Sequence, residues 1–258
     1  MSESVRFDRA AEFYDRTRAI SGEAMARTVE LLGAELQERG RVLEVGVGTG
    51  LVALPLHASG IDLLGLDLSG PMVAKLIEKA GGRAPFPIAL GDATRLPFGE
   101  GAFGAAYLRW VLHLIPDWRG VLAEIVRVVR PRGVFVAHLG AYAGPDEEIR
   151  KRFAEITGVS LEPVGLPWSG FDELDREMAG HGASVRLLPP VPERGEGTIG
   201  QLLDGIDRNV YSWTWNLPDD VRRNAAAEVR AWAHERFGPI DVVTGWEQPH
   251  VWHAYDLA

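Results

Sequence analysis

The stretch Arg41-Val42-Leu43-Glu44-Val45-Gly46-Val47-Gly48-Thr49-Gly50-Leu51 (residues 41–51) carries the strongest structural signal in this chain. A short apolar run containing Glu44 is followed by glycines at three alternate positions. Glycine is needed where a tight strand-to-helix turn requires positive φ and where backbone approaches a ligand closely. The stretch therefore predicts a strand, a glycine loop and a helix that cradle a nucleotide-type cofactor.

The spacing of the glycines indicates which cofactor this loop accepts. Dinucleotide enzymes use G-x-G-x-x-G, in which the last glycine permits close helix–strand packing and the helix N-terminus faces a pyrophosphate. Leu51 occupies that last position here, and Glu44 places a carboxylate nearby that would repel a pyrophosphate. A ligand carrying an ammonium or a sulfonium group suits the carboxylate better. The pattern disfavours NAD, and a nucleotide-dependent oxidoreductase on the same layered fold is kept as an alternative.

Three further segments follow the glycine loop in order. Ile61–Ser69 is an apolar run with an acid, Asp67, placed where an open α/β sheet presents a carboxylate to ribose hydroxyls. Gly91–Phe98 contains a third acid, and Phe103–Asp117 is a long apolar stretch interrupted by basic residues. Together the four segments resemble the class I S-adenosylmethionine (SAM) dependent methyltransferases over about residues 40–140. The likeness is to the small-molecule branch, methyltransferase type 11, which includes quinone-biosynthesis and natural-product enzymes.

The resemblance implies an α/β fold with a doubly wound, mostly parallel, Rossmann-like sheet of seven strands. N-terminal helices would precede the sheet, and a helical insertion would lie before the last strand. One methyltransferase domain is expected over residues 1–258, with a helical cover at 1–40, a SAM-binding core at 41–140 and a C-terminal part at 141–258 that carries the insertion at about 190–245. SAM would be the cofactor and S-adenosylhomocysteine the product. A noncatalytic SAM-binding protein is the second alternative.

The hydrophobic pattern predicts the same alternation of strands and helices. Apolar runs at 42–45, 61–66, 87–90, 102–107 and 134–139 predict strands, and the segments at 51–58, 71–80 and 119–129 predict helices between them. Such alternation is typical of a parallel sheet covered on both faces. Helices are also expected at 7–18, at 21–37 with Ser21 as its cap, and at 172–180, 199–210 and 219–237. A looser Pro/Gly-bearing segment spans 143–170, strands are expected at 183–188 and 250–257, and 193–200 has the composition of a linker.

The predicted cofactor-binding residues cluster where strands end. Glu44 is expected near the methionine end, Asp67 on the ribose and Asp92 at the adenine, while Leu68, Met72 and Ala93 would line the adenine slot. The full set is Tyr14, Arg18, Glu44, Gly46, Gly48, Asp67, Leu68, Met72, Asp92, Ala93 and Arg109. For Asp67 and Asp92 the alternative role is capping a turn, and for Leu68 and Met72 it is plain core packing.

Four of the candidate residues come from outside the central loops or have two competing roles. Tyr14 and Arg18 belong to FYDRTR, which resembles the family's N-terminal helix that covers the cofactor with a ring and a basic residue; packing of Tyr14 in a helix interface is the alternative. Arg109 follows the fourth predicted strand and contacts either the cofactor or a nearby helix. His113 is the candidate general base, because imidazole titrates near neutrality, with a structural role as the alternative.

Composition excludes several classes of function. A formal net charge of −9 and a pI near 5.3 disfavour a nucleic-acid partner, because phosphate backbones bind Lys/Arg surfaces. The absence of cysteine excludes disulfides and thiolate catalysis, and the histidines lack metal-ligand spacing, so no metal is predicted. A polar N-terminus and the lack of a long apolar run predict a cytoplasmic protein without a membrane partner. The sequence names neither the acceptor, which we expect to be a small molecule, nor the oligomeric state.

Overall fold

The computed structural model describes residues 4–18, 20–140 and 145–258, which fall into two compact units. The first unit contains the chain up to Gly140 together with Val164–Glu193 and Pro249–Ala258. The second unit contains 145–163 and Arg194–Gln248. All of the predicted cofactor-binding residues belong to the first unit.

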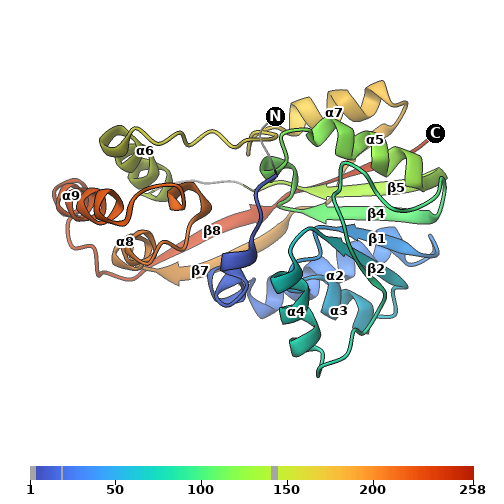
Figure 1. Cartoon of the computed structure of the whole chain (residues 1–258), viewed down its shortest axis with the longest axis horizontal. Helices are drawn as coiled ribbons and strands as arrows, with labels where there is room; N and C mark the ends of the chain where they lie inside the picture. Colours follow the sequence, from blue (N-terminus) through green and yellow to red (C-terminus); the bar gives the residue numbers. More distant parts are fainter. Residues whose placement is uncertain (1–3, 19, 141–144) are drawn as a thin grey trace. The chain divides into compact units, whose positions relative to one another are not determined.

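The first unit is built on a seven-stranded sheet with the order β3-β2-β1-β4-β5-β9-β6 (Figure 1). Its strands are β1 (Val42–Val45), β2 (Leu63–Asp67), β3 (Ile88–Leu90), β4 (Phe103–Arg109), β5 (Val129–His138), β6 (Ser184–Leu187) and β9 (Trp252–Asp256). The first five pair in parallel, and β9 runs antiparallel to both β5 and β6. The predicted doubly wound, mostly parallel sheet is confirmed.

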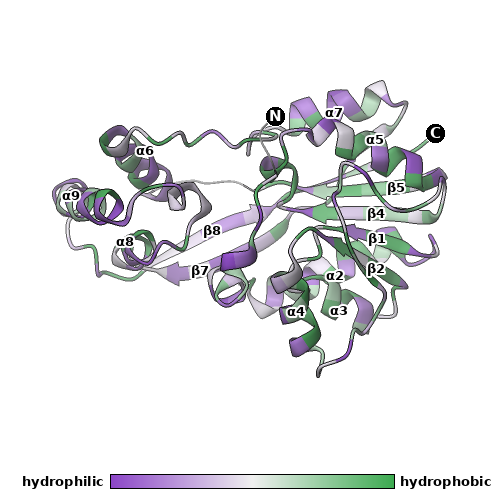
Figure 2. Ribbon diagram, in the orientation of Figure 1, coloured by the Kyte–Doolittle hydropathy of each residue, from purple (hydrophilic) through white to green (hydrophobic). Residues whose placement is uncertain are grey.

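Both faces of this sheet are covered, so the central strands β1 and β4 are buried along their whole length and are mostly apolar, with Glu44 and Arg109 as the charged exceptions (Figure 2). The helices of the first unit are α2 (Gly22–Leu36), α3 (Ala53–Ala58), α4 (Gly70–Lys79), α5 (Trp118–Val128) and α7 (Phe171–Gly180). Residues of α5 and α7 form one buried cluster with the sheet, and residues of α2, α3 and α4 form the other. Ser21 caps α2 as predicted, because its Oγ accepts a hydrogen bond from Ala24 N–H at 3.2 Å.

The N-terminal helix expected at 7–18 is not continuous. It consists of the short helix η1 (Asp8–Ala10) and the single turn α1 (Tyr14–Thr17), separated at Phe13, whose φ of −123° and ψ of −3° leave helical geometry. The expectation of one helix was wrong because such a short segment has little helical stability of its own and follows its tertiary contacts.

The second unit combines three helices with part of a two-stranded sheet. Its helices α6 (Pro145–Thr157), α8 (Ile199–Asp207) and α9 (Asp219–Phe237) share a buried core, with η3 (Ser212–Thr214) between α8 and α9. The aromatic residues near η3 belong to this core, since Trp213 lies 5.6 Å from the Tyr211 ring and 5.2 Å from the Phe153 ring. Neither the sequence pattern nor the resemblance predicted α6, which falls in the segment 143–170, whose first two positions lie outside the described residues.

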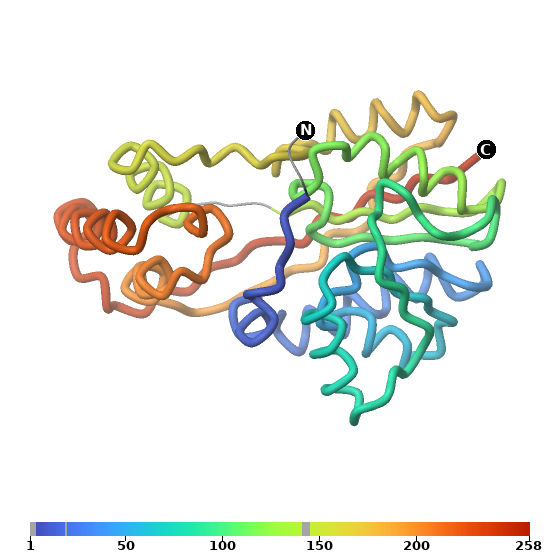
Figure 3. The backbone as a smooth tube through the Cα atoms, viewed as in Figure 1, coloured from blue at the N-terminus to red at the C-terminus, as the bar shows by residue number. Residues whose placement is uncertain are grey.

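The strands β7 (Val191–Gly197) and β8 (Thr244–His250) pair with each other, and Figure 3 shows their backbones side by side. The expectation of a linker at 193–200 was therefore wrong. The strand sequence VPERGEG has no apolar alternation, and its pairing is supported by a cross-strand ion pair, Arg194 Nε to Glu247 Oε2 at 3.0 Å. No helix in the described ranges combines the length and apolarity needed to cross a bilayer.

Candidate functional site

The glycine loop and Asp67 meet at the carboxyl edge of the sheet. The Gly48 N–H donates to Asp67 Oδ2 at 2.7 Å, and the Ser69 N–H donates to Asp67 Oδ1 at 2.8 Å. Gly48 adopts φ +52°, a conformation that turns its N–H toward the end of β2. Burial raises the pKa of Asp67 while these backbone donors lower it. The two hydrogen bonds hold the carboxylate beside the loop in one orientation.

Gly46 allows the loop to pass directly beneath the segment that follows β4. It has φ +77°, and a Cβ at this position would lie 2.4 Å from Val111 Cγ2. Both the backbone conformation and the lack of space require glycine here. The loop from β1 and the loop from β4 are thus in direct contact at the edge where open α/β sheets bind ligands.

A network around Asp15 attaches α1 to the glycine loop. Asp15 accepts a hydrogen bond from Thr49 Oγ1 and pairs with Lys79 Nζ at 2.5 Å, and Lys79 also donates to the Thr49 carbonyl at 2.9 Å. Tyr14, the preceding residue, interacts electrostatically with Arg109, Arg18 and Asp67, and burial raises its pKa. The network therefore holds α1 against the glycine loop, and Tyr14 lies near enough to Arg109 and Asp67 to interact with their charges.

Glu44 is a buried, protonated acid. It is the register partner of Tyr107 on β4, and Tyr107 Oη donates to Glu44 Oε2 at 2.5 Å. Burial raises the pKa of Glu44 to about 8, against the opposing effect of the Tyr107 hydrogen bond. At pH 7 the side chain is uncharged in the absence of a ligand, and a neighbouring cation would convert it to the carboxylate.

The predicted adenine end has mixed geometry. Asp92 is exposed, and its Oδ1 accepts from both the N–H and the Oγ1 of Thr94 at 2.9 Å, so one oxygen caps a turn. Met72 is buried next to the loop, since its Cε lies 3.3 Å from where a Gly48 side chain would begin. Ala93 is buried and Leu68 is partly exposed.

Comparison with known proteins agrees with this architecture. Residues 43–137 match the model of a family described as methyltransferase domain. The demethylmenaquinone methyltransferase of Beutenbergia cavernae is 36% identical over 135 residues, which are 50% of this chain and 54% of that protein. The chain therefore spans about half the length of this curated relative.

Two solved structures share the fold at low sequence identity. A SAM-dependent methyltransferase of Thermotoga maritima superposes with a TM-score of 0.59 at 19% identity and covers 98% of both chains. A Haemonchus contortus phosphoethanolamine N-methyltransferase, solved with phosphomonomethylethanolamine and S-adenosylhomocysteine, gives a TM-score of 0.51 at 15% identity over 96% of this chain and 59% of that chain. Residues 43–137 are thus similar to a methyltransferase domain in sequence, and the chain shares its fold with these two structures.

A second polar cluster lies at the ends of β4 and β5, and sequence analysis missed most of it. His138 ends β5 opposite Arg109; its Nδ1 donates to the Val251 carbonyl at 2.7 Å, which leaves Nε2 to accept from His250 Nδ1 at 3.2 Å. The His250 Nε2 lies 3.6 Å from Glu193 Oε2. Burial lowers the pKa of His250 to about 4 and that of His138 well below its usual value, so both rings are neutral.

Some signal for this cluster exists in the sequence. His138 closes a predicted strand at the same edge as Glu44, so the rule that ligands bind at carboxyl ends of strands could have found it. His250 and Glu193 carry no such signal, because His250 lies 112 residues from His138 along the chain and both residues are placed by the pairing of β7 with β8. These two residues are recognisable only from the fold.

His113 has an environment that disfavours base catalysis. It lies in the short helix η2 (Leu112–Leu114), is buried, and packs on Trp168 with ring centroids 3.7 Å apart. Burial lowers the pKa of His113 to about 3. An imidazole with that pKa accepts protons poorly at neutral pH. The structural alternative for His113 is therefore favoured, and the site relies on other groups.

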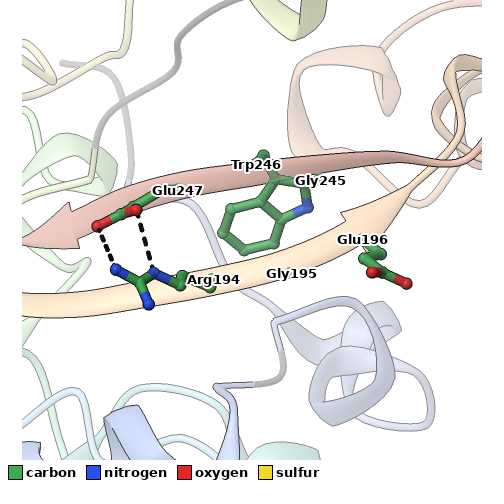
Figure 4. A pocket seen from close by; sticks show the side chains of 6 residues that line it. All are labelled: Arg194, Gly195, Glu196, Gly245, Trp246 and Glu247. Carbon is green, nitrogen blue, oxygen red and sulfur yellow. Dashed lines mark hydrogen bonds and ion pairs between the residues drawn. The ribbon is translucent and has the colours of Figure 1, made fainter.

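Other places offer less for ligand chemistry. In the described ranges, no three His, Asp or Glu side chains gather in a way that could hold a metal ion. A surface hollow between β7 and β8 is lined by Arg194, Gly195, Glu196, Gly245, Trp246 and Glu247 (Figure 4). Trp246 there is 48% exposed and the Arg194–Glu247 pair faces solvent, so the hollow lacks the buried polar groups found at the carboxyl edge of the seven-stranded sheet.

Proposed function

We propose that this chain transfers a methyl group from SAM to a small-molecule acceptor. The observation that carries the proposal is the pair of hydrogen bonds from the Gly48 and Ser69 N–H groups to Asp67, at 2.7 and 2.8 Å. They hold a carboxylate where ribose hydroxyls would donate to its remaining lone pairs. When bound, SAM supplies an electrophilic methyl group on its sulfonium.

The residues present fit such a cofactor. The loop at Gly46 and Gly48 offers backbone without side chains, and Met72 and Ala93 offer a buried apolar surface beside it. Glu44 is protonated without a ligand and becomes a counter-charge once an ammonium group lies beside it. The Tyr14 ring, attached to the loop through Asp15, supplies an aromatic face toward a sulfonium.

The chain would contribute positioning and water exclusion more than acid–base chemistry. Orienting two bound reactants supplies roughly 7 to 11 kcal/mol of a barrier when the acceptor is already nucleophilic. The neutral rings of His138 and His250 and the buried Tyr107–Glu44 pair form an uncharged, hydrogen-bonded wall at the end of β4 and β5. A wall of this kind keeps water from the reacting atoms.

A small acceptor is supported over a macromolecular one. The net charge of −9 gives no basic surface for a nucleic acid, and the relative that matches half of this chain is named as an enzyme that acts on demethylmenaquinone. A nucleotide-dependent oxidoreductase is disfavoured by Leu51 in place of the third glycine and by the buried Glu44. A noncatalytic SAM-binding role differs from the proposal only in turnover.

Calorimetric titration with SAM and with S-adenosylhomocysteine tests the assignment. We expect micromolar binding that Asp67→Ala abolishes and Asp67→Asn weakens, because Asn keeps the side-chain size but loses the charge. Asp62→Ala is the matched control: Asp62 is exposed at the opposite end of β2 and pairs only with Arg41 at 3.2 Å among the ion pairs of the described residues. Unchanged binding in Asp67→Ala, or tight NADH binding measured by fluorescence, contradicts the proposal.

A further inference from the structure

Arg109 is a buried cation without a counter-ion. It ends β4, is 8% exposed, and its Nε and Nη2 atoms have no hydrogen-bond partner. In the described part of the chain no carboxylate lies within ion-pair distance of it. Burial lowers the pKa of Arg109 to about 10, so the guanidinium stays charged at neutral pH. An unpaired buried charge is costly and points to a ligand that supplies the missing partner.

The two unpartnered nitrogens of Arg109 lie on one edge of the guanidinium. The same edge holds a carboxylate with two parallel hydrogen bonds elsewhere in this protein: Arg186 Nε and Nη2 donate to Asp256 at 2.6 and 3.1 Å. Arg194 uses it for Glu247 and Arg236 uses it for Glu148. A planar, bidentate acceptor such as a carboxylate matches this edge.

Two carboxyl groups, Glu44 and Glu193, favour the charge of Arg109 electrostatically, but in the described residues neither makes a hydrogen bond or an ion pair with it. Glu44 is protonated and bound by Tyr107, and Glu193 accepts from the Ser21 N–H at 3.1 Å. The unsatisfied buried atoms around the cluster are donors: besides the two on Arg109, they are Nε1 of Trp110 and Nε1 of Trp252. A cluster that holds only unmatched donors requires a group that only accepts, and a carboxylate is such a group.

Aromatic rings define the shape of the ligand. Trp110 has φ +57°, which is uncommon for a bulky residue, and this turn brings its ring to 3.8 Å from the Arg109 guanidinium carbon. The Trp110 ring lies 6.1 Å from the His138 ring, which in turn lies 4.9 Å from the Trp252 ring. The Trp110 ring lies against the guanidinium and the other two rings follow from it, and this series of flat rings favours a flat ligand.

We propose that Arg109 binds the carboxylate of a planar, aromatic methyl acceptor. This inference rests on the proposed function and replaces the cofactor-binding role predicted for Arg109. Arg109 pairs in register with His138 on β5, whereas Asp67 and the glycine loop belong to β2 and β1 on the other side of β4. The carboxylate is an anchor and the methyl group goes to another atom, because an oxygen held by two N–H donors is a weaker nucleophile.

The test uses planar acids and their uncharged carboxamides as probes. Benzoate, indole-3-carboxylate and 2-naphthoate, each with its amide, are titrated into the full-length protein saturated with S-adenosylhomocysteine. We expect at least one acid to bind about tenfold or more tightly than its amide, Arg109→Met to abolish that preference, and Arg109→Lys to retain part of it. Arg41→Met, which removes an exposed arginine at the far end of the sheet, keeps the wild-type preference.

Cofactor binding separates this inference from the alternative that Arg109 binds the carboxylate of the cofactor. S-adenosylhomocysteine and 5′-methylthioadenosine differ by the amino-acid part, so their affinity ratio reports on the group that binds the cofactor carboxylate. The ratio is expected to be the same in wild type and Arg109→Met; a tenfold loss confined to S-adenosylhomocysteine would overturn the inference and leave the proposed function intact. Equal binding of every acid and its amide would do the same, whereas failure of the wild type to bind S-adenosylhomocysteine would overturn both.

The thermal midpoint of unfolding, measured for each variant, shows whether the variant still folds. Removal of an unpaired buried cation is expected to leave the midpoint of Arg109→Met unchanged or raised. A lowered midpoint for Arg109→Met would show that Arg109 has a structural partner and would also overturn the inference.

Discussion

Binding of S-adenosylhomocysteine is expected to release a proton from Glu44. The pKa of this carboxyl is raised to about 8 by burial, so about 0.9 of the molecules carry the proton at pH 7. An ammonium group about 4 Å away stabilises the carboxylate by roughly 4 kcal/mol at an effective dielectric constant near 20, a factor of about a thousand in proton affinity. Glu44 would then be ionised in the complex, and the release approaches one proton.

The affinity for S-adenosylhomocysteine must depend on pH in the same proportion. Because the bound form carries fewer protons than the free form, the dissociation constant is expected to fall by about eightfold per pH unit between about pH 6 and 7 and to level off near pH 8. Calorimetry in two buffers of different ionisation enthalpy gives the number of protons directly. Glu44→Gln should bind more weakly, release no proton at this site and lose the pH dependence.

5′-Methylthioadenosine provides the control for this measurement. It lacks the ammonium group, so any proton released on its binding comes from Asp67 or another group near the ribose, whose pKa is also raised. The difference between the two ligands isolates Glu44. Equal release by both ligands in the wild type, or release that persists in Glu44→Gln, would refute the assignment of Glu44 to the ammonium group.

The remaining predictions concern stability and the cover of the site. Because the pKa of Glu44 rises from 4.5 to about 8 on folding, its contribution to the free energy of unfolding is full below pH 4.5 and is lost as the pH rises toward 8. The slope of this loss is about 1.4 kcal/mol per pH unit. Glu44→Gln should flatten the slope and raise the free energy of unfolding by about 2 to 3 kcal/mol at pH 7, measured by urea unfolding. Gly46→Ala should lower the free energy of unfolding by about 2 kcal/mol or more, because its Cβ would clash with Val111. Gly81→Ala, also at positive φ but with open space around it, should lower it by only about 1 kcal/mol. Equal losses would exclude the clash with Val111 as the cause. Asp15→Ala should speed tryptic cleavage near α1 and weaken S-adenosylhomocysteine binding about threefold to tenfold. Glu12→Ala, which removes an exposed ion pair on the same segment, should do neither. If the two variants behave alike, the Asp15 network does not hold α1 over the site.

The parts of the site that sequence predicts are those encoded by local signals. The glycine loop follows from spacing, and Gly46 has both the positive φ and the tight contact that the pattern implies. Asp67 is predicted because it ends an apolar run where an open α/β sheet presents a carboxylate; its two backbone donors hold it beside the loop, and its contact with a ribose stays a prediction. Short-range patterns suffice where neighbours in the chain are also neighbours in space.

The parts that sequence missed depend on pairing between distant segments. The strand β7 was read as a linker because VPERGEG is polar and only its partner β8 makes it a strand. His250 meets His138 because β9 runs antiparallel to β5 in one register, with Ala137 opposite His253 and His138 opposite Trp252. No local rule encodes that register, since it follows from the fit of buried side chains across the sheet.

Glu44 and Arg109 lie on one face of the sheet at the same edge. Glu44 suits the cationic cofactor, and Arg109 suits an acid. Glu44 is neutral until a cation arrives, and Arg109 is positive and unpaired. A sulfonium that enters alone faces an uncompensated guanidinium, whereas one that enters beside a bound acid does not. By linkage, the acid must therefore strengthen SAM binding more than it strengthens S-adenosylhomocysteine binding, because only SAM carries the sulfonium charge. The same difference lowers the driving force for transfer, because the positive charge that the bound acid stabilises is lost from sulfur as the methyl group leaves.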